Sequence, residues 1–204
     1  MKKNPIDIFS DWAVIGKDKG MEKNHAKSVQ DMLEFAYKNL KNFSFIDAGC
    51  GNGWVVRKVS KNKECRNSIG VDGSSKMIDK AVSLDKKNDY FCSNLLQWIP
   101  EKPVDLVHSM EVFYYFNNPK KIIKHIYSNW IKIGGRLIMG VDFYYENEIS
   151  HSWPDETNVN TMILLKEKDW INIFKEVGFS NVKKWRSGKK NNWAGTLVVT
   201  GTKN

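Results

Sequence analysis

Hydrophobic and polar positions alternate along the chain with two different spacings, which indicates helices and strands in turn. Apolar residues at helical spacing (Val29, Met32, Leu33, Ala36 and Leu40) predict an amphipathic helix over residues 26–41. Short apolar runs without this spacing predict strands over residues 43–48, 68–72, 90–92, 104–109 and 136–143. Further helices are expected over residues 54–61, from Ser74 or Ser75 through Ala81, and over residues 119–131.

The end of the chain carries one more helix and two more strands. The helix is expected over residues 167–177 and ends at Gly178, and strands over residues 182–186 and 195–200 can pair as an antiparallel hairpin. Strands separated by helices need right-handed crossovers and form a parallel sheet with helices on both faces. The sequence therefore predicts an α/β fold. It is a three-layer α-β-α sandwich around a mostly parallel seven-stranded sheet with an antiparallel C-terminal edge hairpin strand.

The length of 204 residues and a hydrophobic content of 41% suit a single domain over residues 1–204. Residues 12–25 are too rich in glycine and charge to be core, so residues 1–25 are expected to form a lid over a core of residues 26–204. No run of about 18 apolar residues and no leader pattern is visible, so we expect a cytoplasmic protein without a membrane partner.

The net charge of +9 raises the question of a nucleic-acid partner. The lysines are scattered, however, and lysine pairs fall at the ends of predicted elements, so nucleic-acid binding is disfavoured. Cys50, Cys65 and Cys92 are odd in number and have no CxxC spacing, which argues against a disulfide framework and against a zinc site. We therefore expect no metal.

A glycine-rich turn follows the strand of residues 43–48. Gly49, Gly51 and Gly53 occupy every second position, and glycine permits positive φ and close approach of a ligand to the backbone. The next strand ends in Asp72, nineteen residues after Gly53, close to the spacing at which such folds bind ribose hydroxyls. The same residues also fit a purely structural role, because glycines serve turns and a strand-end aspartate can cap a helix.

The spacing differs from the GxGxxG of nicotinamide and flavin enzymes, because Trp54 occupies the place of the third glycine. The run DAGCGNG at residues 47–53, followed by GVDGSSKMI, resembles motif I and the acidic loop of class I S-adenosylmethionine-dependent methyltransferases, especially the small-molecule branch. Residues 104–112 resemble the fourth strand and its loop in that family, and residues 132–138 resemble the turn into the fifth strand. The resemblance covers residues 43–143.

This resemblance implies that S-adenosylmethionine is the methyl donor and S-adenosylhomocysteine the product. The glycine turn would surround the methionine part, Asp72 would bind the ribose, and adenine would lie between Gly73 or Ser74 and the end of the third strand. Family members often place an acidic residue after that strand, where this chain has Ser93 and Asn94. The cofactor-binding residues expected from the resemblance are Asp47, Gly49, Cys50, Gly51, Gly53, Asp72, Gly73, Ser74, Met77, Ser93, Asn94, Leu95 and Ser109.

Methyl transfer from a sulfonium depends mainly on alignment, and a base is needed only where the acceptor must lose a proton. Acceptor residues are expected in loops at the carboxyl ends of strands, over residues 111–116 and 142–153, and in residues 9–25. These segments are rich in aromatic residues, and aromatic faces beside Glu111 or Glu146 suit a cation. The candidate catalytic residues are His151, Glu111 and Tyr115.

We therefore expect methyl transfer to a nitrogen, oxygen or sulfur atom of a small molecule. Enzymes that methylate the amines of nucleic-acid bases commonly carry Asn/Asp-Pro-Pro-aromatic after the fourth strand, where this chain has Ser109-Met110-Glu111-Val112. An RNA or protein methyltransferase and a noncatalytic S-adenosylmethionine-binding protein are the alternatives, because a fold does not fix a function. The oligomeric state is left open between a monomer and a homodimer.

Overall fold

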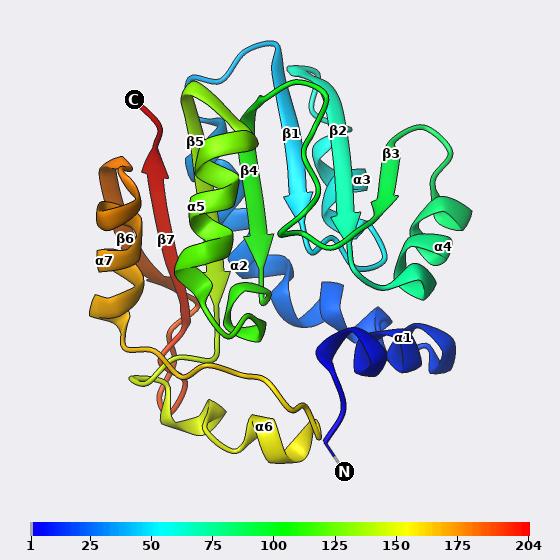
Figure 1. Cartoon of the computed structure of the whole chain (residues 1–204), viewed down its shortest axis with the longest axis vertical. Coiled ribbons are helices and arrows are strands. Elements are labelled where there is room, and N and C mark those ends of the chain that lie inside the picture. The colour runs from blue at the N-terminus through cyan, green and yellow to red at the C-terminus, as the bar shows by residue number, and fades with distance from the viewer. Residues whose placement is uncertain (1) are drawn as a thin grey trace.

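A seven-stranded sheet forms the centre of the computed structural model, which describes residues 2–204 (Figure 1). Neighbouring strands are parallel except for β7, which runs antiparallel to both β5 and β6. The predicted mostly parallel sheet with an antiparallel closing strand is therefore confirmed. Across the sheet the order is β3 (Asp89–Cys92), β2 (Cys65–Asp72), β1 (Phe43–Ala48), β4 (Val104–Met110), β5 (Ile131–Val141), β7 (Thr196–Thr202) and β6 (Ser180–Ser187).

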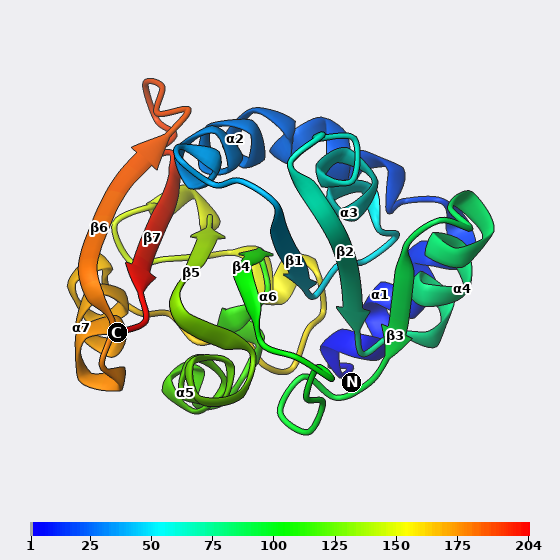
Figure 2. The same cartoon turned by 90° about the horizontal axis from the view of Figure 1, so that it is seen from above.

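Helices cover both faces of the sheet, which gives the three predicted layers (Figure 2). One face packs against α2 (Lys19–Tyr37) and α3 (Trp54–Val59), and the other packs against α5 (Pro119–Asn129) and α7 (Glu167–Val177). The helix α4 (Ser75–Leu84) lies along β2 and β3. All six residues of β1 are buried, as expected for a strand covered on both faces.

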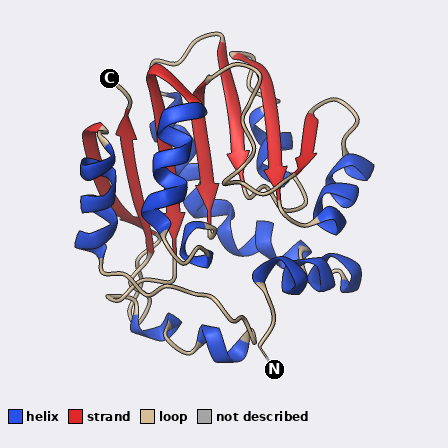
Figure 3. Ribbon diagram, in the orientation of Figure 1, coloured by secondary structure: helices blue, strands red, loops and turns tan. Residues whose placement is uncertain are grey.

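The carboxyl ends of β1, β2 and β4 point toward a layer of short helices and loops (Figures 1 and 3). This layer contains α1 (Pro5–Ile15), the 3₁₀ turns η1 (Phe113–Tyr115) and η2 (Glu148–Ser150), and the short helix α6 (Trp153–Glu156). The N-terminal segment is tied to it, because the Lys3 N–H donates to the Asn158 carbonyl at 2.9 Å and the Asn160 N–H donates to the Lys3 carbonyl at 2.9 Å. Met1, the first residue of the predicted lid, lies outside the described residues. None of the helices within residues 2–204 has the length and apolar character required to cross a membrane.

Several element boundaries differ from the sequence-based expectation. The helix expected over residues 26–41 covers Lys19–Tyr37 instead, because Asn39 adopts a left-handed φ of 75° that ends it early. The strand expected to reach Phe143 ends at Val141. The sequence analysis missed α1 altogether, although Asn4 accepts a hydrogen bond from the Ile6 N–H and Pro5 follows it, which is a standard helix start.

Two buried tryptophans on the α5/α7 side of the sheet provide a matched test of this packing. Trp130 donates its indole N–H to the Trp98 carbonyl at 2.9 Å, whereas the indole N–H of Trp170 has no hydrogen-bond partner within residues 2–204. We expect Trp130→Phe to lower the urea midpoint of unfolding more than Trp170→Phe does. Both variants lose similar volume, but only Trp130→Phe loses a hydrogen bond worth about 0.5–1.5 kcal/mol. Equal midpoints, or the reverse order, would contradict this assignment.

Candidate active site

The glycine turn after β1 is held in a conformation that only glycine adopts easily. Gly49, Gly51 and Gly53 have φ of 77°, 52° and 77°. A Cβ on Gly49 would lie 2.3 Å from a methyl carbon of Val112, and one on Gly53 would lie 2.5 Å from the ring of Tyr90. Close packing therefore requires glycine at these two positions.

Asp72, at the end of β2, fixes the middle of this turn. Its Oδ2 accepts a hydrogen bond from the Gly51 N–H at 2.9 Å, and its Oδ1 accepts one from the Ser74 N–H at 2.8 Å. Burial raises the pKa of Asp72, while these backbone donors oppose the rise. The carboxylate thus links the glycine turn to the start of α4.

A cavity of about 630 Å³ opens beside this turn, and we call it the glycine-loop cavity. Its roof comes from the N-terminal segment, through Pro5, Ile6 and Phe9 of α1 and Met21 of α2. Its floor contains many of the residues that the sequence resemblance singles out, which are Gly49, Gly51, Asp72, Gly73, Met77, Asn94 and Leu95. A volume in this range is typical of a small-molecule site.

The remaining predicted cofactor residues do not line this cavity, and several of them support the turn from behind. Asp47 is buried and its Oδ1 lies 2.7 Å from Nδ1 of His108. Ser109 donates its hydroxyl to the Ala48 carbonyl at 2.9 Å, and Ser74 accepts from the Met77 N–H to cap α4. The others outside the lining are Cys50, Gly53 and Ser93. Sequence position alone does not separate residues that face the cavity from those behind it.

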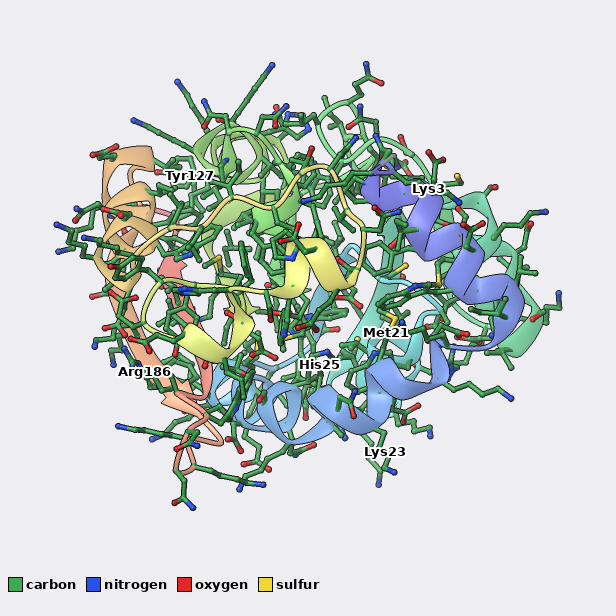
Figure 4. All side chains as sticks on the ribbon, turned by 90° about the horizontal axis from the view of Figure 1, so that it is seen from below. Lys3, Met21, Lys23, His25, Tyr127 and Arg186 are labelled. Carbon is green, nitrogen blue, oxygen red and sulfur yellow. The ribbon has the colours of Figure 1, made fainter. Side chains whose placement is uncertain are left out.

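A second cavity of about 510 Å³ adjoins the first, and we call it the aromatic cavity. Phe9, Met21, Glu111 and Tyr115 line both cavities and form their common boundary. Figure 4 shows Met21 and His25 on the side of α2 that faces α6, whereas Lys23 points away from it. The wall of the aromatic cavity also contains Trp12, His25, Tyr114, Asp142, Trp153 and Trp193.

Glu111 lies directly after β4 in an uncommon backbone conformation, with a left-handed φ of 60°. Its N–H donates to the Gly140 carbonyl at 2.9 Å, which holds this turn against β5. The carboxylate accepts a hydrogen bond from the Tyr114 hydroxyl at 2.7 Å and another from the Asp142 N–H. Burial, and secondly the negative charge of Asp142, raise the pKa of Glu111 well above its usual range.

Asp142, the first residue after β5, is the acidic neighbour of Glu111. Its side chain is only 5% exposed, and its Oδ1 has no hydrogen-bond partner among the described residues. Nδ1 of His25 lies 3.5 Å from its Oδ2, and the Asn147 side-chain amide donates to its main-chain carbonyl at 2.8 Å. The sequence analysis included Asp142 and His25 only as the ends of two candidate segments, residues 142–153 and 9–25, and singled out neither. The position of Asp142 directly after a strand was the feature of the sequence that could have identified it as a site residue.

The three candidate catalytic residues do not meet. Glu111 and Tyr115 lie together at the cavity boundary, and burial raises the pKa of Tyr115, which keeps its hydroxyl protonated at neutral pH. His151 lines neither cavity, because Nε2 of its ring lies 2.9 Å from the Tyr145 carbonyl. The prediction that His151 is a base therefore has no geometric support. Glu146 also lies outside both linings and accepts from the Glu167 N–H at 2.9 Å.

The raised pKa of Glu111 predicts a pH-dependent stability difference. A carboxyl whose pKa is higher in the folded protein stabilises it most below the unfolded pKa, and this contribution is lost as pH rises through the folded pKa. Glu111→Gln removes the ionisation and keeps a carbonyl that can accept from the Asp142 N–H. We expect the melting temperature of Glu111→Gln to exceed that of the unmodified protein at about pH 8. Each kcal/mol gained in the free energy of unfolding raises the melting temperature by about 2–4 °C in a protein of this size. The excess should shrink toward about pH 4, where free glutamate protonates. A difference that does not change with pH would contradict the buried-carboxylate assignment.

Comparison with known proteins agrees with this geometry. Residues 21–184 match the family described as a methyltransferase domain. A trans-aconitate 2-methyltransferase from Rhizobium rhizogenes is 28% identical over 115 residues, which make up 56% of this chain and 44% of that protein. The chain spans about half the length of the curated relatives it matches.

Solved structures share the fold at lower identity. A Haloferax volcanii structure, described as a complex of the Trm112 methyltransferase activator with a methyltransferase, matches with a TM-score of 0.81 and 23% identity over 99% of each chain. The N-methyltransferase NodS from Bradyrhizobium japonicum, in complex with S-adenosylhomocysteine, matches with a TM-score of 0.67 and 16% identity, over 85% of this chain and 84% of that one. The chain therefore belongs to the methyltransferase domain family, as a class I methyltransferase domain that uses S-adenosylmethionine.

Proposed function

We propose that the whole protein is an enzyme that transfers the methyl group of S-adenosylmethionine to a small molecule. The observation that carries this proposal is the pair of adjoining cavities with Glu111 and Tyr115 at their boundary. One cavity contains the glycine turn and suits the donor. The other contains no part of that turn and leaves room for an acceptor beside the transferable methyl group.

In the glycine-loop cavity, the donor is assigned by the chemistry of the lining. The backbone of Gly49 and Gly51, which lines this cavity, suits the methionine part, and the Asp72 carboxylate suits the ribose hydroxyls. Gly73, Met77 and Leu95 offer a mainly apolar surface to adenine, and Asn94 offers a polar group at its edge. The Asp47 carboxylate pairs with His108 and does not line the cavity, so Asp47 would support the glycine turn without contacting the donor.

The size of the aromatic cavity and the elements that line it favour a small acceptor over a nucleic acid or a folded protein. A volume of about 510 Å³ is in the range of drug-sized ligands, and α1 and α6 both contribute residues to its wall. Bases and peptide side chains would have to pass these elements to reach the boundary. We therefore retain a small molecule as the acceptor class.

The reaction in this arrangement is an in-line displacement. A lone pair of the acceptor forms the new bond to the methyl carbon while the carbon–sulfur bond breaks and its electrons stay on sulfur. The sulfonium is a good leaving group, so the residues of the chain contribute mainly by holding the two reactants in line and excluding water. Phe9, Met21 and Tyr115, which line both cavities, are placed to do this.

Substitution of Asp72 tests the donor assignment. We expect Asp72→Asn to weaken S-adenosylmethionine binding at least tenfold, which corresponds to about 1.4 kcal/mol, because the amide loses the charged acceptor for ribose. Isothermal titration calorimetry measures this, with the melting temperature as a check on folding. Asp79→Asn, an exposed aspartate on α4, is the matched control and should bind normally. A folded Asp72→Asn protein with normal affinity would refute the assignment.

Removal of α1 tests the predicted lid. We expect a chain without residues 2–15 to stay folded and to bind S-adenosylmethionine at least tenfold more weakly, because Pro5, Ile6 and Phe9 roof the donor cavity. A matched control replaces the outward-facing Val14 and Ile15 with serine, since these side chains are 72% and 71% exposed. Circular dichroism and calorimetry give the two readouts. Unchanged affinity in the truncated chain would show that α1 is not a lid.

A further inference from the structure

We propose that the acceptor is an amine, and that its nitrogen is held at the cavity boundary between the carboxylates of Asp142 and Glu111. This inference rests on the proposed function, because it names the chemical class of molecule that the aromatic cavity receives. It depends on three features of the described residues, which are an unsatisfied buried carboxylate, aromatic walls and a position next to the donor.

The first feature is the unsatisfied carboxylate. Asp142 is nearly fully buried, and its Oδ1 has no hydrogen-bond partner within residues 2–204. An unpaired buried charge is costly, and here a second carboxylate, Glu111, lies against it and accepts a hydrogen bond from its N–H. An ammonium group would offset both negative charges and would supply the missing donor to Asp142.

The second feature is the aromatic wall around these acids. Trp12, Trp153 and Trp193 line the cavity with Tyr114 and Tyr115, and Trp153 stacks on Trp193 with ring centroids 6.4 Å apart. Aromatic faces attract cations and also bind apolar groups. The side of the cavity away from the acids therefore suits the hydrocarbon part of an organic amine.

Positive groups on the wall do not satisfy the acids. Among the described residues that line the aromatic cavity, Lys17 is the one lysine or arginine, and its Nζ lies over the Trp12 ring at 4.1 Å from the centroid. His25 is 3.5 Å from Asp142 and only 21% exposed, so it borders the pair without filling its Oδ1 side. These acids are also not part of a metal-ion group, since none is found among residues 2–204.

The third feature is the position of the acids. Glu111 lines both cavities, so an amine bound to it also faces the donor. The Asp142 carbonyl is held by the Asn147 amide at 2.8 Å, and the Ala194 N–H donates to the Asn147 side-chain oxygen at 3.2 Å. These bonds connect the acid to the segment that carries Trp193, which fixes acid and aromatic wall relative to one another.

The proposed step balances as follows. A bound primary ammonium, R–NH₃⁺, gives one proton to the carboxylate pair and becomes R–NH₂ with a free lone pair. That lone pair forms the nitrogen–carbon bond as the methyl–sulfur bond breaks and its electrons stay on sulfur. The products are R–NH₂⁺–CH₃ and neutral S-adenosylhomocysteine sulfur, and the proton leaves toward the partly exposed His25. Positive charge thus moves from sulfur to nitrogen beside two acids, where it is stabilised.

Three probes of matched size test the proposal in the full chain loaded with S-adenosylhomocysteine. Phenethylamine is cationic, 2-phenylethanol is neutral and phenylacetate is anionic. Binding is followed by quenching of tryptophan fluorescence and by calorimetry. We expect phenethylamine to bind at least tenfold more tightly than 2-phenylethanol and phenylacetate to bind least. With S-adenosylmethionine present, mass spectrometry should place the added methyl group on the nitrogen of phenethylamine.

Asp142→Asn should reduce phenethylamine affinity at least tenfold and leave the affinities for 2-phenylethanol and S-adenosylmethionine within twofold. Glu148→Gln removes an exposed carboxylate from the same segment and is the control that should change nothing. Equal binding of the three probes, binding of none, or an unaffected Asp142→Asn variant overturns the amine assignment. Failure of the unmodified chain to bind S-adenosylmethionine refutes the proposed function instead, so the two failures are distinguishable.

Discussion

The hydrogen bonds of the Asp72 carboxylate are the interaction on which the site depends. One oxygen holds the Gly51 N–H and the other holds the Ser74 N–H, so a single side chain joins the glycine turn to the start of α4. Backbone from two successive β-α connections is thereby fixed at the carboxyl edge of a parallel sheet, where such folds bind ligands. Burial raises the pKa of Asp72, and the hydrogen bonds from the Ser74 and Gly51 N–H groups oppose that rise.

The sheet itself could be predicted from the sequence, and the cavity could be predicted in part. Short apolar runs and local start and stop signals were enough for all seven strands and for α3, α4, α5 and α7, and the helical spacing of apolar residues was enough for α2. The prediction failed for α1, whose apolar residues include the exposed Val14 and Ile15 and therefore follow no single buried face. Its capping signal at Asn4 and Pro5 was visible but was not used.

The contact between Glu111 and Asp142 could not be predicted, because these residues meet only through the sheet. Glu111 follows β4 and Asp142 follows β5, and the two are neighbours only because these strands pair. A pair of residues this far apart in the sequence cannot be recognised from the sequence alone, whereas the residues of the glycine turn follow one another directly. His151 is the opposite case. It lies in the expected loop, but its ring bonds to the Tyr145 carbonyl of the same loop and faces neither cavity.

The N-terminal segment connects the two halves of the site. Phe9 and Met21 line both cavities, Trp12 and His25 line the aromatic cavity, and all four belong to α1 or the first turns of α2. The segment is anchored where Asp18 accepts hydrogen bonds from the Asn52 amide at 2.8 Å and from Lys80 at 2.6 Å. Asn52 lies within the glycine turn, so the position of the turn and that of the roof are linked through one buried carboxylate.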